Sequence, residues 1–220
     1  GWSNIGYYVI LESKRVGKKG LVYAIEPVKE NFKLLKKNIA LNKLKNVKTY
    51  NIAFSDKKGE IEINVSGEGN LNTPNKIKNP IRIEKIGGES LDSFFKGKKK
   101  PSFMRMDIEG YEDVIFRGGD KTLNHLDKIF VELHFPLIER EKMIVLLKKL
   151  KEKGFEVHKA VLEWERWEDP SFLGKIVNYL HKKRSKTIVF DITIDKLLAD
   201  KKFMGGHLSL EVFFTKKTPT

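Results

Sequence analysis

Short runs of β-branched and aromatic residues alternate with segments of helical hydrophobic period along most of this chain, and this alternation constrains the fold more than any other feature. Residues 21–26 form an apolar run typical of a buried strand, and Pro27 then suits the first turn of a helix. One apolar face of that helix is formed by Val28, Phe32, Leu35 and Ile39. Strands that alternate with helices predict an α/β fold with a mainly parallel sheet covered on both faces.

The remaining elements are predicted from the same patterns. Further strands are predicted at residues 47–54, 60–65, 81–86, 102–107, 128–134, 155–162 and 208–215. Helices are predicted from about Tyr111, over residues 138–153 and near residues 173–183, and Ser90 is predicted to cap a short helix that runs through Phe95. Apolar and polar residues alternate over 60–65, which indicates a half-exposed strand antiparallel to a neighbour.

Length and composition suit a single domain over residues 1–220 with a substantial core. Residues 163–206 are expected to be an irregular insertion, in which Trp164, Trp167 and Phe172 form either a small packed cluster or a lid. The absence of cysteine excludes a thiolate nucleophile and a Cys-ligated zinc. No apolar run has membrane-spanning length and no signal peptide is recognised, so the expected location is the cytoplasm, with no membrane partner.

The charge balance is strongly basic: 43 Lys and Arg stand against 29 Asp and Glu, for a net charge of +14. Such a charge fits RNA, an acidic surface or an anionic substrate as partner. It also fits lysines dispersed over solvated helix faces, which their scattered distribution favours. Two local clusters, at residues 98–100 and 182–184, keep RNA open as a partner.

Polar residues stand where the first predicted strands end, and parallel sheets bind ligands at the carboxyl ends of their strands. Asn4 and Gly6 belong to a glycine-bearing turn, and Glu26 ends the next strand about twenty residues later. In nucleotide-binding βαβ units an acid at this position takes the ribose hydroxyls. The alternative is that Glu26 only caps the helix that begins at Pro27.

A second group of carboxylates surrounds the end of the predicted strand 102–107. Asp107 ends the strand, Glu109 follows two residues later, and Gly110 permits a sharp turn. Two carboxylates this close repel each other unless a positive group or a hydrogen-bond donor separates them. The alternative is that Glu109 and Glu112 decorate a helix N-terminus, which accounts for Glu112 better than for Asp107.

Several of these segments resemble the FkbM family of methyltransferases. Residues 22–31 are similar to its ribose-binding strand and helix, and residues 90–94 with 103–112 resemble its most diagnostic block, which includes Asp-Ile-Glu-Gly. Residues 118–123 and 131–134 are similar to the family's segments on the C-terminal side of that block, so the resemblance covers roughly residues 4–134.

The resemblance implies a Rossmann-like, doubly wound class I methyltransferase fold with an antiparallel C-terminal strand. It further implies S-adenosylmethionine as cofactor and a small-molecule or glycan hydroxyl as acceptor. By position, Asn4 and Gly6 would lie along the methionine, Glu26 with Pro27 would hold the ribose, Ala53, Ser55 and Asp56 would flank the adenine, and Asp107 would stand near the sulfonium and the acceptor.

The first turn departs from the family pattern, because Trp2 stands where a glycine is usual and the strand that normally precedes the turn is absent from the sequence. The domain is therefore expected to lack its first strand. Three functions stay open: O-methylation of a small molecule or glycan, methylation of RNA, and non-catalytic nucleoside binding.

A hydroxyl acceptor must lose a proton during methyl transfer, and the candidate groups are Asp107, Glu109, Glu132 and His134. His134 has the intrinsic pKa best suited to a base near neutrality. The alternative is a histidine at a strand edge that is bonded only to backbone. No spacing typical of a metal site is present.

Overall fold

The computed structural model describes residues 2–67, 72–163, 187–204 and 209–217. These residues form two compact units, 1–126 and 127–220, and each unit has its own helices and strands. The predicted helix near residues 173–183 and the aromatic cluster of Trp164, Trp167 and Phe172 lie outside the described residues.

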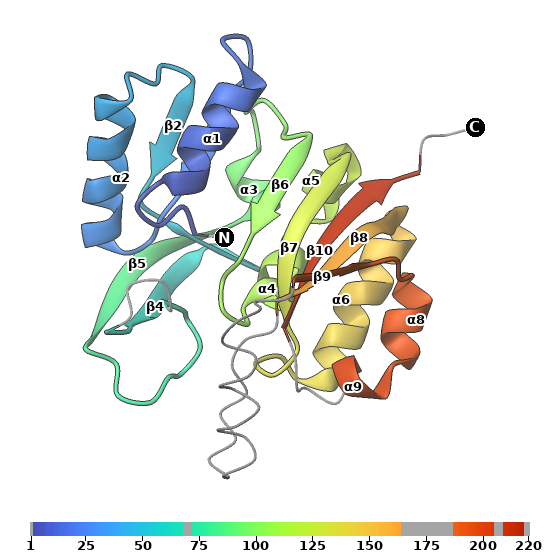
Figure 1. The fold of residues 1–220 in the computed structure, drawn as a ribbon. Helices are drawn as coiled ribbons and strands as arrows, with labels where there is room; N and C mark the ends of the chain where they lie inside the picture. The colour runs from blue at the N-terminus through green and yellow to red at the C-terminus, as the bar shows by residue number, and fades with distance from the viewer. Residues whose placement is uncertain (1, 68–71, 164–186, 205–208, 218–220) are drawn as a thin grey trace. The chain divides into compact units, whose positions relative to one another are not determined.

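The first unit alternates strands with helices over most of its length (Figure 1). Its helices are α1 (Tyr7–Val16), α2 (Lys29–Leu41), α3 (Leu91–Phe94), α4 (Glu112–Arg117) and α5 (Asp120–His125). Its strands are β1 (Val22–Ile25), β2 (Val47–Tyr50), β3 (Ala53–Ser55), β4 (Gly59–Val65), β5 (Arg82–Ser90) and β6 (Phe103–Met106). The predicted strand 47–54 is thus divided into β2 and β3.

The strands of the first unit pair in both directions. β1 and β2 are parallel, in register from Val22 opposite Val47 to Ile25 opposite Tyr50. In the sheet β3-β5-β4, β5 is parallel to β3 and antiparallel to β4. The antiparallel strand predicted over residues 60–65 is therefore confirmed, and so is the cap at Ser90, whose side chain accepts a hydrogen bond from the backbone N–H of Ser93.

Two apolar clusters and one aromatic cluster hold the first unit together. α1 and α2 pack on β1 through Val9, Val22, Ala24 and Leu35. A second cluster is formed by Val28, Ala53, Ile63 and Val65, with Trp2, Ile61 and Ile86 packed against it. The ring of Phe94 in α3 contacts Tyr23, Tyr50, Phe54 and Phe95 edge-on, at centroid distances of 4.8–6.0 Å. Edge-on geometry is the one that aromatic rings favour.

The second unit contains the strands β7 (Lys128–His134), β8 (Phe155–Glu163), β9 (Thr187–Phe190) and β10 (Ser209–Lys216), and the helices α6 (Arg140–Glu152), α8 (Ile194–Ala199) and α9 (Lys201–Met204). β10 lies antiparallel between β7 and β8, and β9 pairs antiparallel with β8. The predicted antiparallel C-terminal strand is confirmed. Residues 187–204, expected to be irregular, instead contain β9, α8 and α9.

The structure confirms the α/β class and shows mixed sheets, because the β4–β5 hairpin and the C-terminal strands add antiparallel pairs to the parallel ones. Helix α6 shows why the periodic pattern was informative: its buried residues Met143, Leu146, Leu147 and Leu150 recur at helical spacing. In the described part of the chain, no helix combines the length and apolar character needed to cross a membrane.

Candidate active site

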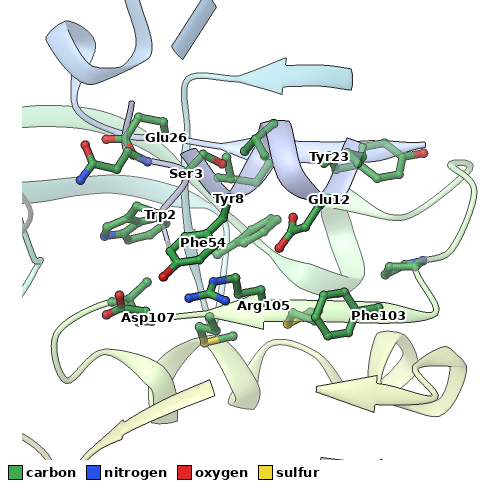
Figure 2. Close-up of a pocket in the computed structure, with 18 of the residues that line it drawn as sticks. Trp2, Ser3, Tyr8, Glu12, Tyr23, Glu26, Phe54, Phe103, Arg105 and Asp107 are labelled. Atoms are coloured by element: carbon green, nitrogen blue, oxygen red, sulfur yellow. The ribbon is translucent and has the colours of Figure 1, made fainter. Parts of the chain in front are cut away.

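A cavity of about 650 Å³ lies within the first unit, between β1 and β6 (Figure 2). Its walls come from the N-terminal residues 2–5, from α1, and from both strands. Glu26 and Asp107 both line it, at the end where Trp2 also lies, whereas Tyr23 and Phe103 lie at the other end. The two carboxylates that the sequence analysis singled out thus face one cavity, at the carboxyl ends of two strands.

The N-terminal residues connect these two strand ends. The backbone N–H of Trp2 donates to the carbonyl of Asp107 over 3.3 Å, and that of Ser3 donates to the carbonyl of Ile25 over 2.7 Å. The chain then turns at Gly6, whose φ of 97° lies in the left-handed region. This conformation favours glycine, and a Cβ at Gly6 would also lie 2.6 Å from Cδ1 of Leu35 in α2, so that side chain would have to move.

Glu26 is buried at the end of β1, with 1% of its surface exposed. Its Oε2 accepts from the backbone N–H of Asn4 over 2.7 Å, and its Oε1 accepts from that of Val28 over 3.0 Å. Burial raises the pKa of this carboxyl to about 7, although the hydrogen bonds from Val28, Asn4 and Asn31 act in the lowering direction. The bond from Val28 is made just ahead of α2, and the bond from Asn4 fastens the N-terminal turn to the end of β1.

Asp107 belongs to a tightly held turn. Glu109 and Gly110 have positive φ values of 54° and 85°, and the N–H of Gly110 donates to Oε1 of Glu112 over 3.2 Å. The carbonyl of Glu109 accepts from Oγ1 of Thr73 over 3.0 Å and from Nδ2 of Asn75 over 3.2 Å. Asp107 lines the cavity and Glu109 does not. Glu112 is fully buried in the first turn of α4, the helix N-terminus at which the alternative assignment placed it.

The predicted adenine-flanking residues lie at the end of β3 and just beyond it. Ala53 is fully buried among Val28, Ile63 and Val65. The hydroxyl of Ser55 lies 3.4 Å from that of Tyr111, and Asp56 lies 3.9 Å from Arg117. None of the three lines the cavity, but their neighbour Phe54 does. Their contact with adenine stays a prediction.

Three lining residues were not singled out from the sequence. The guanidinium carbon of Arg105 in β6 lies 3.4 Å from the ring centroid of Tyr8, which is a cation–π contact. Burial raises the pKa of Glu12, and the charge of Arg105 opposes that shift. Tyr8 and Glu12 stand four residues apart on α1, so they share the helix face that borders the cavity. The spacing of four residues was the sequence feature from which this shared helix face could have been predicted.

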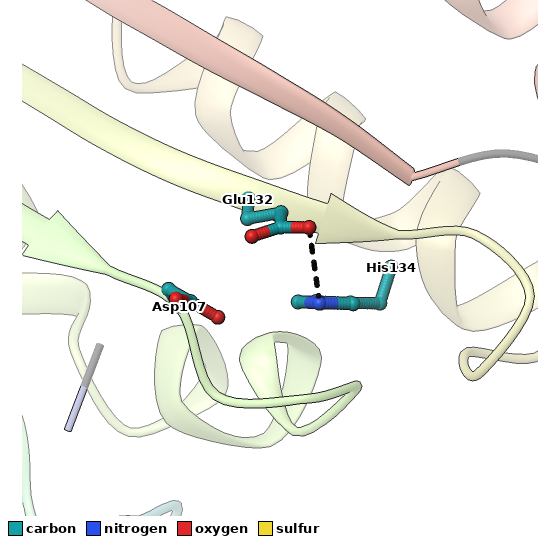
Figure 3. Close-up of side chains that lie close together, drawn as sticks. All are labelled: Asp107, Glu132 and His134. Atoms are coloured by element: carbon teal, nitrogen blue, oxygen red, sulfur yellow. Dashed lines mark ion pairs between the residues drawn. The ribbon is translucent and has the colours of Figure 1, made fainter. Parts of the chain in front are cut away.

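Glu132 and His134 lie two residues apart on β7, and hence on one side of the strand, in the second unit. Oε1 of Glu132 lies 3.4 Å from Nε2 of His134, as Figure 3 shows. The imidazole is buried, with 6% of its side chain exposed, and the Glu132 side chain is 27% exposed. The pair thus places a carboxylate oxygen beside a buried ring nitrogen.

Comparison with known proteins identifies the family. The sequence model of the methyltransferase FkbM domain matches residues 3–183. No curated protein sequence matches significantly. Among solved structures, a methyltransferase FkbM from Methylobacillus flagellatus KT is 18% identical with a TM-score of 0.45, over 60% of this chain and 31% of that one. This chain thus spans about a third of that protein.

Two further structures cover nearly all of this chain. A precorrin-6y C5,15-methyltransferase from Geobacter metallireducens GS-15 is 9% identical with a TM-score of 0.47, over 99% of this chain and 77% of that one. M. jannaschii TYW2 in complex with AdoMet is 16% identical with a TM-score of 0.41, over 98% of this chain and 67% of that one. Because all three TM-scores lie below 0.5, the assignment rests on the sequence match, which covers well over half of the chain. The chain belongs to the methyltransferase FkbM domain family, as its motifs predicted.

Proposed function

We propose that this chain binds S-adenosylmethionine at the Glu26–Asp107 end of the cavity and methylates a hydroxyl oxygen of a small molecule or glycan. The observation that carries the proposal is the shared cavity: Glu26 and Asp107, 81 positions apart in sequence, line one space at the carboxyl ends of β1 and β6. The family of the chain supports the reaction class.

The residues present fit this cofactor. A carboxylate has about four acceptor sites, so Glu26 keeps capacity for a sugar hydroxyl beyond its hydrogen bonds from Asn4, Val28 and Asn31. Within the described residues, the buried Nε1 of Trp2 has no hydrogen-bond partner, and Trp2 is one of the residues that line the cavity. A buried donor without an acceptor costs about 1–3 kcal/mol, which a polar ligand atom within hydrogen-bond distance of Nε1 would recover.

The cofactor, when bound, supplies a methyl group on a sulfonium that is displaced in line by the acceptor oxygen. The protein's contribution is to hold the partners and to accept the hydroxyl proton. Asp107 is the expected group near the acceptor. Glu109, Glu132 and His134 remain candidates for the proton acceptor.

Calorimetric titration with S-adenosylmethionine tests the cofactor part of the proposal. We expect the Glu26→Ala variant to bind at least tenfold more weakly, because hydrogen bonds to a charged group are worth about 1.5–3 kcal/mol. The exposed Glu60→Ala variant serves as the matched control and should bind like the wild type. Equal affinity of all three proteins would remove Glu26 from the site.

Transfer itself is tested with methyl-labelled S-adenosylmethionine and separate panels of hydroxylated metabolites, glycans and RNA. Asp107→Ala is expected to lower the turnover at least a hundredfold while the protein stays folded. Label in RNA alone would replace the proposed acceptor class. Cofactor binding without transfer to any panel would indicate a non-catalytic nucleoside-binding domain.

A further inference from the structure

The segment 72–75, between β4 and β5, brings polar side chains into the interior of the first unit. Asn72 and Thr73 are buried, with 4% and 2% of their surfaces exposed. Burial of a polar group is costly unless the group is hydrogen-bonded, so the partners of these residues show what the segment does. Asn72 also lines the cavity, at whose wall Asp107 lies beside Trp2 (Figure 2).

One side of the segment is fastened to β4. The backbone of Thr73 exchanges two hydrogen bonds with that of Asn64, at 2.9 and 3.3 Å, and Nδ2 of Asn64 donates to the carbonyl of Asn75 over 3.0 Å. Oδ1 of Asn72 accepts from the N–H of Ser66 over 3.0 Å. These bonds hold the segment on β4 without using the side chains of Thr73 and Asn75.

The side chains of Thr73 and Asn75 are both directed to one carbonyl, that of Glu109. Oγ1 of Thr73 donates to this carbonyl over 3.0 Å, and Nδ2 of Asn75 donates to it over 3.2 Å. The hydroxyl of Thr73 also accepts from the N–H of Asn75 over 3.2 Å, which orients the hydroxyl. A carbonyl oxygen has two lone pairs, so the two donors together can satisfy it.

Glu109 has a backbone conformation that needs such support. Its φ of 54° lies in the left-handed region, which residues other than glycine, asparagine and aspartate adopt rarely. A conformation of this kind persists only where the surrounding structure fixes it, and it occurs often at functional sites. Asp107 is two residues before Glu109, so a change of conformation at Glu109 would shift the backbone that carries the Asp107 carboxylate.

We propose that Thr73 and Asn75 are positioning residues for methyl transfer, which hold the Glu109 carbonyl and thereby keep Asp107 in place at the cavity. This role rests on the proposed function, which puts Asp107 near the acceptor. Neither Thr73 nor Asn75 lines the cavity, so their effect on the reaction is indirect. The effect can still be large, because a displacement of about 1 Å can lower a rate by about a hundredfold.

Two threonine-to-valine variants separate positioning from stability. Thr73→Val removes the hydroxyl and keeps the size of the side chain. Thr122→Val is the matched control, because Thr122 is also buried, with 1% exposed, and its hydroxyl donates to Asp92 over 2.8 Å without lining the cavity. Thr73→Ser keeps the hydroxyl and should restore the function of the position.

Turnover is measured with methyl-labelled S-adenosylmethionine and the acceptor panels used for the wild type. Thr73→Val should lower kcat roughly tenfold or more and change KM for S-adenosylmethionine by less than about twofold, because it disturbs the turn at Asp107 and not Glu26. Thr122→Val and Thr73→Ser should keep both constants near those of the wild type. An equal fall of kcat in Thr73→Val and Thr122→Val would overturn the proposal, because stability alone would then explain it.

Hydrogen exchange of the Gly110 amide, measured without ligand, reports on the turn itself. It should become roughly tenfold faster in Thr73→Val and change little in Thr122→Val. Asn75 is only half-buried, so Asn75→Ala gives the same comparison should Thr73→Val fail to fold. Wild-type exchange in Thr73→Val or in its Asn75→Ala substitute would overturn the proposal at any activity. Faster exchange in a protein whose wild type transfers no methyl group would support the hold on the turn and refute the proposed function.

Discussion

Glu26 is a buried carboxyl with a raised pKa, and this pKa leads to a prediction about stability. Its folded-state pKa of about 7 lies above the ordinary value of 4.5, so the folded protein binds more protons than the unfolded chain between these pH values. The free energy of unfolding therefore falls as the pH rises from about 4.5 to 7, by at most about 3 kcal/mol from this group. Urea unfolding at pH 5 and pH 8 measures the change.

The Glu26→Gln variant is the control for this pH dependence, because it has no proton to release. It should lose less stability than the wild type between pH 5 and pH 8. The same loss in both proteins would show that another group is responsible.

Gly118 allows a close approach of two backbone segments. A Cβ at this position would lie 2.5 Å from the carbonyl oxygen of Ser55 and 2.9 Å from Cα of Asp56. We expect Gly118→Ala to lower the free energy of unfolding by about 2–3 kcal/mol, because backbone atoms cannot give way cheaply. Gly87→Ala is the matched control, since nothing lies within 4 Å of its added Cβ. Chemical denaturation should distinguish the two, and similar losses would contradict the steric argument.

At the residue scale, the sequence revealed those groups whose position follows from a strand end. Glu26 and Asp107 each end an apolar run, and the carboxyl ends of parallel strands gather ligands. Arg105 gave no such signal, because its role depends on contact with Tyr8 from a distant helix. Likewise, the hold of Thr73 and Asn75 on the Glu109 carbonyl depends on a long loop whose path no local pattern encodes.

Among the elements, α5 depends on a side chain from another part of the chain. The carboxylate of Asp92 accepts from the N–H groups of Lys121 and Thr122 and from the hydroxyl of Thr122, at 2.7–2.9 Å. Burial alone would raise the pKa of Asp92, but these hydrogen bonds lower it overall. The stabilisation is thus present at neutral pH and is lost as the pH falls through the lowered pKa.

Replacing this cap tests its contribution. Asp92→Ala should lower the free energy of unfolding by about 1–2 kcal/mol at pH 7, the usual effect of losing a helix cap. Ser93→Ala changes an exposed neighbour and should have little effect. The difference between the two variants, measured by urea unfolding, should shrink at acidic pH, and a difference that stays constant would rule out a role for the carboxylate charge.

Periodicity located β7 and α6, but it did not locate α1 or several of the short elements. β7 and α6 were predicted because each repeats its pattern several times. α5, α8 and α9 have only four to six residues each, too few for a helical period to repeat. The four residues of β9 form a strand because β8 offers an edge to pair with, which is a tertiary effect.

For the whole molecule, binding of the cofactor should increase the free energy of unfolding. At a free ligand concentration of 100 times Kd, S-adenosylmethionine should raise the free energy of unfolding by about 2.7 kcal/mol. A rise of about 5–10 °C in the thermal midpoint corresponds to this for a chain of this size. Differential scanning fluorimetry measures the shift, and Glu26→Ala at the same ligand concentration should show a much smaller one. An identical shift in that variant would place the ligand elsewhere.

The net charge of +14 remains the one global feature without an assigned role. In the basic cluster 98–100, the ammonium group of Lys98 donates to the carbonyl of Phe94, and that of Lys100 donates to the carbonyl of Phe95, at the end of α3. These lysines contribute to local structure, as cations at a helix C-terminus do. The charge therefore does not by itself indicate a nucleic-acid surface.

The indole of Trp2 on the cavity wall makes the protein its own optical probe. Indole emission shifts with the polarity around the ring, so entry of any molecule beside Trp2 should change the fluorescence without a label. The chain has three tryptophans, and a Trp2→Phe variant isolates the contribution of this one by difference. Emission spectra can thus report when and how fast the cavity fills.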